Sequence, residues 1–153
     1  MKKEKLPCSK KKANINYKHE RTKFTNGTKF MVEIFYKDDS YKIVGIIIKV
    51  FKDLGYGYQE KYYYRAIKEA LIQAGFLVEE QVLTKLVYAG KSIGRYYLDF
   101  LVNKTIVLEI KVSNEIYPRH IKQVLGYLTA NNLKLGIIAA FTKNGVVFKR
   151  VVN

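Results

Sequence analysis

Two strand-like runs joined by only three residues constrain the fold of this chain more than any other feature. Residues 95–102 (RYYLDFLV) and 106–112 (IVLEIKV) are rich in β-branched and aromatic side chains, which favour strands. The linking Asn-Lys-Thr segment is short and polar, as hairpin connections are. The sequence therefore predicts an antiparallel hairpin whose pairing decides which side chains share a face of the sheet.

The pairing in this hairpin brings three charged side chains together. We take Val102 and Ile106 as the pair that closes the turn. Asp99 then lies directly opposite Glu109, with both side chains on one face of the sheet. Lys111 shares that face, because side chains two positions apart in a strand point the same way. A two-residue turn would shift the pairing by one residue and separate the two carboxylates, so a charge cluster requires the three-residue turn.

Two carboxylates and an ammonium on one strand pair predict a metal-dependent phosphodiesterase site. Facing carboxylates repel each other unless a cation lies between them. Mg²⁺ binds such oxygens while keeping several water molecules, one of which can attack a phosphate. Lys111 can orient that water or neutralise charge on the phosphate. The alternative is structural: Lys111 forms a salt bridge with one carboxylate, and no chemistry follows.

Two helices are expected before the hairpin. Apolar residues recur at helical spacing over residues 39–54, where Asp39 or Ser40 suits the N-cap position. A second apolar stripe covers residues 58–75 and places Glu60 at its edge, where the helix meets the core. Glu60 either serves the site or complements the helix dipole from the first turn.

Strand periodicity replaces helical periodicity after the second helix. Residues 76–82 and 83–88 are two candidate strands that precede the hairpin. A helix is expected over residues 118–131, and the apolar run 135–141 is typical of a central strand buried on both faces. Residues 146–152 follow a Lys-Asn-Gly turn as the last strand. This succession predicts an α/β domain.

A polar stripe runs along the helix expected after the hairpin. His120, Gln123 and Tyr127 recur at helical spacing, a pattern that usually marks a solvated face. If this stripe faces the charged cluster, it supplies hydrogen bonds to Lys111 or to a phosphate. We expect His120 to be a surface or capping residue rather than a metal ligand, because Mg²⁺ prefers oxygen.

The charge balance favours a polyanionic partner. Lys and Arg total 28 against 13 Asp and Glu, a formal charge of +15. Residues 1–30 carry ten basic and two acidic residues without an apolar period, which predicts a flexible basic arm before a domain over residues 31–153. Nucleic acid is the commonest polyanion, although a solubilising tail explains the same charge.

Compartment signals are few. Cys8 is the only cysteine, so neither an intramolecular disulfide nor a cysteine-based zinc site can form. The longest apolar stretch, residues 43–51, is interrupted by Gly45 and Lys49 and is too short to span a bilayer. No apolar segment follows the charged N-terminus as in a signal peptide. We therefore expect a cytoplasmic protein without membrane association.

Several motifs together resemble one known family. Asp99 and the Glu-Ile-Lys run at 109–111 are similar to the PD-(D/E)xK nuclease pattern, with its proline missing. Residues 57–63 (GYQEKYY) resemble the signature of the GxxExxY protein family, a group that resembles that superfamily. Residues 120–128 and 136–153 resemble the later helix and the end of the same family.

The resemblance spans residues 41–153 and implies a restriction-endonuclease-like core, a mixed central sheet flanked by helices in αβββαβ order. It also implies a site that uses Mg²⁺ or Mn²⁺. The implied metal ligands are Asp99, Glu109, Glu60 and the carbonyl of Ile110. The implied catalytic residues are Glu60, Asp99, Glu109, Lys111 and Gln123.

The sequence therefore predicts a Mg²⁺-dependent nuclease that hydrolyses phosphodiester bonds in nucleic acid, with DNA favoured over RNA. The alternative is a catalytically silent nucleic-acid-binding or assembly module of the same fold. The complete residue set favours the nuclease, because an inactive site has no physical reason to keep carboxylates that repel each other. A homodimer is left open.

Overall fold

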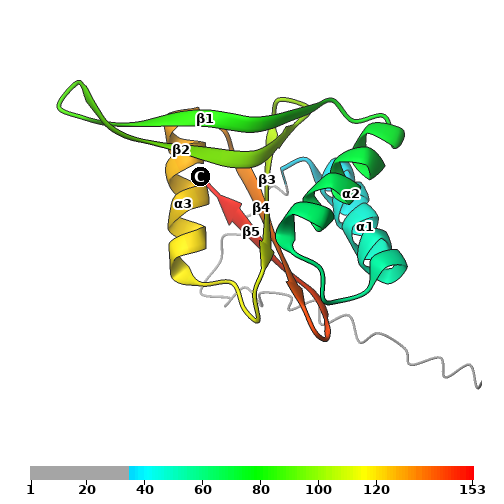
Figure 1. The fold of residues 1–153 in the computed structure, drawn as a ribbon. Coiled ribbons are helices and arrows are strands. Elements are labelled where there is room, and N and C mark those ends of the chain that lie inside the picture. Colours follow the sequence, from blue (N-terminus) through cyan, green and yellow to red (C-terminus); the bar gives the residue numbers. More distant parts are fainter. Residues whose placement is uncertain (1–34) are drawn as a thin grey trace, which may run out of the picture. The chain divides into compact units, whose positions relative to one another are not determined.

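The structure, a computed structural model, describes residues 35–153. The predicted basic arm over residues 1–30 and the boundary at residue 31 lie outside the described residues. The described part contains the predicted αβββαβ succession (Figure 1). None of its helices has the length and apolarity needed to span a membrane. The bounds are α1 (Lys37–Leu54), α2 (Glu60–Gln73), β1 (Val78–Tyr88), β2 (Lys91–Val102), β3 (Ile106–Val112), α3 (Pro118–Ala130), β4 (Leu135–Thr142) and β5 (Gly145–Val152).

The strands form one mixed sheet in the order β1-β2-β3-β4-β5. β3 and β4 run parallel, whereas the other neighbouring pairs are antiparallel. The parallel pair needs a crossover, and α3 provides it. β4 is buried along its whole length, which confirms the central strand predicted from the apolar run 135–141.

Helices cover both faces of the sheet and divide the side chains of β3 between two cores. α1 and α2 pack on one face, where Leu108 and Ile110 belong to the larger buried cluster. α3 packs on the other face, where Val107 belongs to a second cluster. Because side chains alternate along a strand, Glu109 and Lys111 follow Val107 and start from the face that α3 covers.

The predicted hairpin pairing is confirmed. Val102 pairs with Ile106, and the next two pairs of β2 and β3 continue the same register. The turn has three residues, of which Asn103 and Lys104 adopt left-handed conformations with φ of 50° and 58°. Asn103 also accepts a hydrogen bond from the backbone N–H of Leu77 at 3.1 Å, which fixes the turn against the segment before β1.

The predicted N-cap of the first helix is wrong. α1 begins at Lys37, so Asp39 and Ser40 lie within its first turn. Both side chains have other partners: Asp39 accepts a hydrogen bond from the Asn103 amide at 3.1 Å, and Ser40 donates to the Tyr36 carbonyl at 2.7 Å. Only the folded chain brings Asn103 to the helix, so sequence periodicity could not reveal this use of Asp39.

The two strands predicted over residues 76–82 and 83–88 are a single strand, β1. The strand is continuous but irregular at Gln81, where φ is 48° and the residue has no paired partner on β2. α2 is shorter at both ends than the predicted helix over residues 58–75.

A methyl group at Gly136 tests the packing of α3 on the sheet. The added carbon of Gly136→Ala would overlap the side chain of Val124, which is buried between α3 and the sheet. We expect a loss of about 1–3 kcal/mol in the free energy of unfolding, measured by urea denaturation. Gly45→Ala is the matched control, because its added carbon meets nothing within 4 Å and α1 should gain about 0.5–1 kcal/mol. Equal stability of the two variants would contradict the described contact.

Candidate active site

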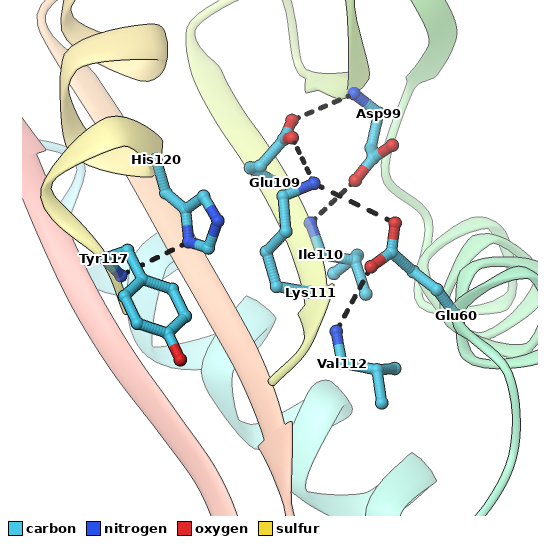
Figure 2. A network of polar contacts seen from close by, with 8 residues as sticks. All are labelled: Glu60, Asp99, Glu109, Ile110, Lys111, Val112, Tyr117 and His120. Carbon is cyan, nitrogen blue, oxygen red and sulfur yellow. Dashed lines mark hydrogen bonds and ion pairs between the residues drawn. The ribbon is translucent and has the colours of Figure 1, made fainter. Parts of the chain in front are cut away.

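The charged cluster lies at the point where β2 and β3 separate (Figure 2). Backbone pairing between the two strands stops at Phe100 and Leu108, one step before Asp99 and Glu109. Side chains replace the missing backbone bonds: the Ile110 N–H donates to Asp99 Oδ2 at 2.7 Å, and the Asp99 N–H donates to Glu109 Oε2 at 3.4 Å. The two carboxylates therefore meet as predicted, although their backbones do not form a ladder pair.

Asp99 also lacks a regular backbone partner on its other neighbouring strand, β1. On β1, the residue that would face Asp99 is Gln81, one irregular point of a strand whose register also shifts between Leu86 and Val87. The Tyr64 hydroxyl lies 3.4 Å from the Asp99 carbonyl and donates its shorter hydrogen bond, of 3.0 Å, to Glu80 Oε1. The Tyr64 ring stacks on Phe100 with ring centroids 4.3 Å apart. Sequence reasoning missed Tyr64, and the available signal was its place one helical turn after Glu60.

Lys111 is held between two carboxylates. Its Nζ lies 2.7 Å from Glu109 Oε1 and 3.8 Å from Glu60 Oε1. The side chain of Glu109 is 3% exposed and that of Lys111 is 20% exposed, so water screens this ion pair weakly. The structure therefore contains the salt bridge that the sequence offered as an alternative, and it places the ammonium beside the acidic pair.

Glu60 joins the site by its contacts with two residues of β3. It is the first residue of α2, and its Oε2 accepts a hydrogen bond from the Val112 N–H at 3.1 Å. Its other oxygen faces Lys111, as described above. Across residues 35–153, no three His, Cys, Asp or Glu side chains converge as they would around a bound metal ion. The structure thus joins Glu60 to the cluster through Lys111 rather than directly to Asp99.

Burial and repulsion change the protonation of the acidic pair. Burial, followed by the charge of Glu109, raises the pKa of Asp99 to about 7. Burial also raises the pKa of Glu109, against the opposing effect of Lys111. Burial alone would lower the Lys111 pKa, but Glu109 and Glu60 outweigh it and raise that pKa. Lys111 therefore stays charged at neutral pH, while Asp99 is close to its point of half-protonation.

The polar stripe of α3 contributes one residue beside the cluster. His120 is buried, with 7% exposure, and its Nδ1 accepts a hydrogen bond from the Tyr117 N–H at 3.4 Å. The predicted capping role is confirmed and the predicted surface position is wrong, because the first turn of α3 faces the sheet. Gln123 lies half-buried one turn later, and within the described chain no hydrogen bond joins it to Lys111 or the carboxylates.

The described residues form two open cavities, of which the first borders the cluster. One has a volume of about 600 Å³ and is bordered by Glu60, Tyr64 and Asp99 together with three basic and two further acidic residues. The other, of about 640 Å³, lies between the β1–β2 hairpin and α3 and includes Lys85, Lys122 and no acidic residue. The lining of the first therefore carries mixed charge, whereas the only charged residues that line the second, largely apolar cavity are the two lysines.

This fold and site define an α/β nuclease-like protein: a mixed sheet between helices, with an acidic pair and a lysine where two strands separate. The chain belongs to the PD-(D/E)XK nuclease superfamily, whose sequence model matches residues 37–151. The match confirms the predicted superfamily and the restriction-endonuclease-like fold, while the narrower GxxExxY family stays a prediction.

Solved structures of low sequence identity are similar to part of the chain. The crystal structure of SSO0001 is 20% identical, with a TM-score of 0.47, over 77% of this chain and 57% of its own length. An alkaline exonuclease, LHK-Exo from Laribacter hongkongensis, is 17% identical, with a TM-score of 0.46, over 74% of this chain and 69% of its own. The complex of LHK-Exo with dAMP is 16% identical, with the same TM-score and coverage. No curated protein matches the sequence.

Proposed function

We propose that this chain is a metal-dependent nuclease that hydrolyses phosphodiester bonds in nucleic acid, DNA in preference to RNA. The observation that carries the proposal is the buried Asp99–Glu109 pair beside Lys111, in a member of the PD-(D/E)XK nuclease superfamily. An acidic pair of this kind is unfavourable as two free charges and favourable around a cation.

The donor set fits Mg²⁺ or Mn²⁺. Asp99 and Glu109 offer hard carboxylate oxygens, and Ile110 between the strand's two charged residues offers a backbone carbonyl. Mg²⁺ commonly takes only one or two carboxylates and keeps several waters, so a ready-made cage of three acidic side chains is not required. When bound, such an ion supplies an activated water and neutralises charge on the phosphate. Glu60 as a further ligand belongs to the same proposal.

The protein's own groups position this chemistry. The Ile110 N–H fixes one oxygen of Asp99, and the Tyr64 hydroxyl, on α2, lies between Glu80 and the Asp99 carbonyl. Glu60 anchors the end of β3 at Val112 and limits where the Lys111 ammonium can move. Lys111 then lies where it can neutralise a phosphate that approaches the acidic pair.

The second cavity, here called the groove, has lysines as its only charged lining residues and favours a nucleic-acid substrate over a small phosphodiester. Lys85 from the hairpin and Lys122 from α3 line it, together with Tyr96 and Leu125. From Ile116 to Asn153 the chain contains six basic residues and no acidic residue. A polyanion that follows this groove meets α3, whose first turn lies beside the charged cluster.

Cleavage assays test the proposed function. Labelled single- and double-stranded DNA and RNA are incubated with the protein in Mg²⁺, Mn²⁺ or EDTA. We expect cutting that requires the metal and is faster on DNA. Binding without cutting in any metal would contradict the nuclease and favour the silent module, in which the Lys111–Glu109 salt bridge is purely structural.

Charge reversal in the groove tests the substrate path. We expect Lys85→Glu with Lys122→Glu to weaken oligonucleotide binding and to reduce the slope of log K against log salt by roughly 0.7–0.9 per lost phosphate contact. Fluorescence anisotropy at several salt concentrations measures both quantities. Lys134→Glu with Lys143→Glu, at exposed positions in the turns on either side of β4, reverses the same two charges outside the groove. Equal slopes for the groove and turn variants would exclude this path.

A further inference from the structure

His120 is a buried histidine whose ring is held in one orientation. It lies in the first turn of α3 and is 7% exposed. The Tyr117 N–H donates to its Nδ1 at 3.4 Å, and the Tyr117 ring contacts the imidazole edge-on, with centroids 5.5 Å apart. Helix capping thus accounts for the hydrogen bond of Nδ1 but gives no role to Nε2.

The hydrogen bond at Nδ1 fixes the proton on Nε2. A nitrogen that accepts a hydrogen bond carries no proton, so a neutral imidazole in this position has its N–H at Nε2. A nitrogen with a proton cannot bind a metal ion. His120 is therefore a hydrogen-bond donor and not a metal ligand, in agreement with its sequence-based interpretation.

The Nε2 atom faces the charged cluster and lacks a partner in the described chain. Figure 2 shows the second ring nitrogen on the side of Lys111, away from Tyr117. No described residue hydrogen-bonds to it. Yet every fully buried side-chain nitrogen and oxygen of the described residues has a hydrogen-bond partner. Because Nε2 has no such partner, it is not fully buried, and a molecule that enters the site can reach it.

The Lys111 ammonium is the cation that favours an anion on the Nε2 side of His120. Besides burial, Lys111 and then Arg119 lower the pKa of His120, against a smaller opposing effect of Glu60. The Nε2 atom faces Lys111, whereas the Arg119 guanidinium lies over the Tyr117 ring, 4.6 Å from its centroid. A phosphate oxygen on the Nε2 side of His120 would accept a hydrogen bond from the N–H donor and be attracted by the Lys111 ammonium.

We propose that His120 is a substrate-binding residue, whose Nε2–H donates a hydrogen bond to a nonbridging oxygen of the scissile phosphate. The inference rests on the proposed function and adds a contact on the α3 side of the phosphate, opposite Glu60. The competing explanation is that His120 only caps α3.

Two substitutions separate these explanations, because each keeps one nitrogen's role. His120→Asn retains an acceptor near the position of Nδ1 and removes the donor at Nε2. His120→Gln retains a donor near Nε2 and gives up the acceptor close to the backbone. We expect His120→Asn to keep the melting temperature and to lower kcat/KM by about 10- to 150-fold, the effect of one hydrogen bond to a charged group. We expect His120→Gln to melt earlier and to restore most of the activity.

Binding provides a second readout that does not need turnover. The dissociation constant of a labelled DNA oligonucleotide is measured in Ca²⁺ for wild type and both variants. We expect His120→Asn to bind more weakly than wild type and His120→Gln to regain most of the lost affinity. If His120→Asn cuts and binds like wild type, the proposed contact is overturned and the capping role suffices. If wild type binds without cutting, the nuclease proposal fails, and the dissociation constants alone decide the His120 contact. If wild type neither binds nor cuts nucleic acid, both proposals fail.

Discussion

Lys111→Ala is expected to slow metal-dependent cleavage by about 10²- to 10³-fold. This is the usual cost of removing one preorganised group that stabilises charge in the transition state. Lys111 is suited to that role because its ammonium is held within 2.7 Å of Glu109, is mostly buried and stays charged at neutral pH. Single-turnover rates at saturating enzyme measure the effect on the chemical step without the contribution of product release.

The stability of this variant must be followed, because Lys111 also compensates the buried charge of Glu109. Glu109 already has a raised pKa, so without the ammonium it should take up a proton and avoid an uncompensated charge. Circular dichroism and the melting temperature report whether the fold persists. Lys111→Arg keeps the charge with a different donor geometry, and Lys143→Ala is an exposed control. A folded Lys111→Ala protein that cuts at the wild-type rate would remove Lys111 from the reaction.

The hairpin shows what the sequence can determine about this fold. Its register follows from local information alone: alternating side chains, a polar turn and the requirement that Val102 meets Ile106. The meeting of Asp99 with Glu109 follows from that register. The same reasoning locates the buried central strand, because an uninterrupted apolar run has few other uses.

The features that the sequence does not determine are tertiary. Gln81 adopts a left-handed conformation at the position that would face Asp99, where the β1–β2 pairing is interrupted, and no local motif marks it. Tyr64 joins the site only because α2 packs against β2. Conversely, Gln123 has the helical spacing of a site residue without a hydrogen bond to the cluster in the described chain.

Asp99→Asn is expected to stabilise the metal-free protein at pH 8 and to abolish its response to metal. The amide can still accept the hydrogen bond of the Ile110 N–H while it removes a charge that burial and Glu109 disfavour. The sign follows from proton linkage. The folded pKa of Asp99 is about 7 and its ordinary value is 3.8, so the folded state binds the proton more tightly. Stability of metal-free wild type therefore falls as pH rises from about 4 to about 7.

The asparagine variant should lack this loss, which amounts to on the order of a few kcal/mol by pH 8. Urea denaturation in EDTA at pH 5 and pH 8 measures the difference in the free energy of unfolding. Asp53→Asn is the matched control, because Asp53 is mostly exposed and its pair with Lys49 contributes little. A variant at Asp99 that is less stable than wild type at pH 8 would show that the carboxylate serves the fold.

Metal should make wild type more stable than Asp99→Asn, the reverse of their expected order in EDTA at pH 8. An ion that binds only the folded state adds about 2.7 kcal/mol at 100 times its dissociation constant, and it must displace the proton of Asp99 to do so. Stabilisation of wild type by Mg²⁺ or Mn²⁺ should therefore grow as pH rises through about 7, whereas Asp99→Asn should show none. If both proteins gain equally from the ion, the metal binds elsewhere. If neither gains, Lys111 is the cation that compensates the acidic pair, which is the arrangement expected of a silent module.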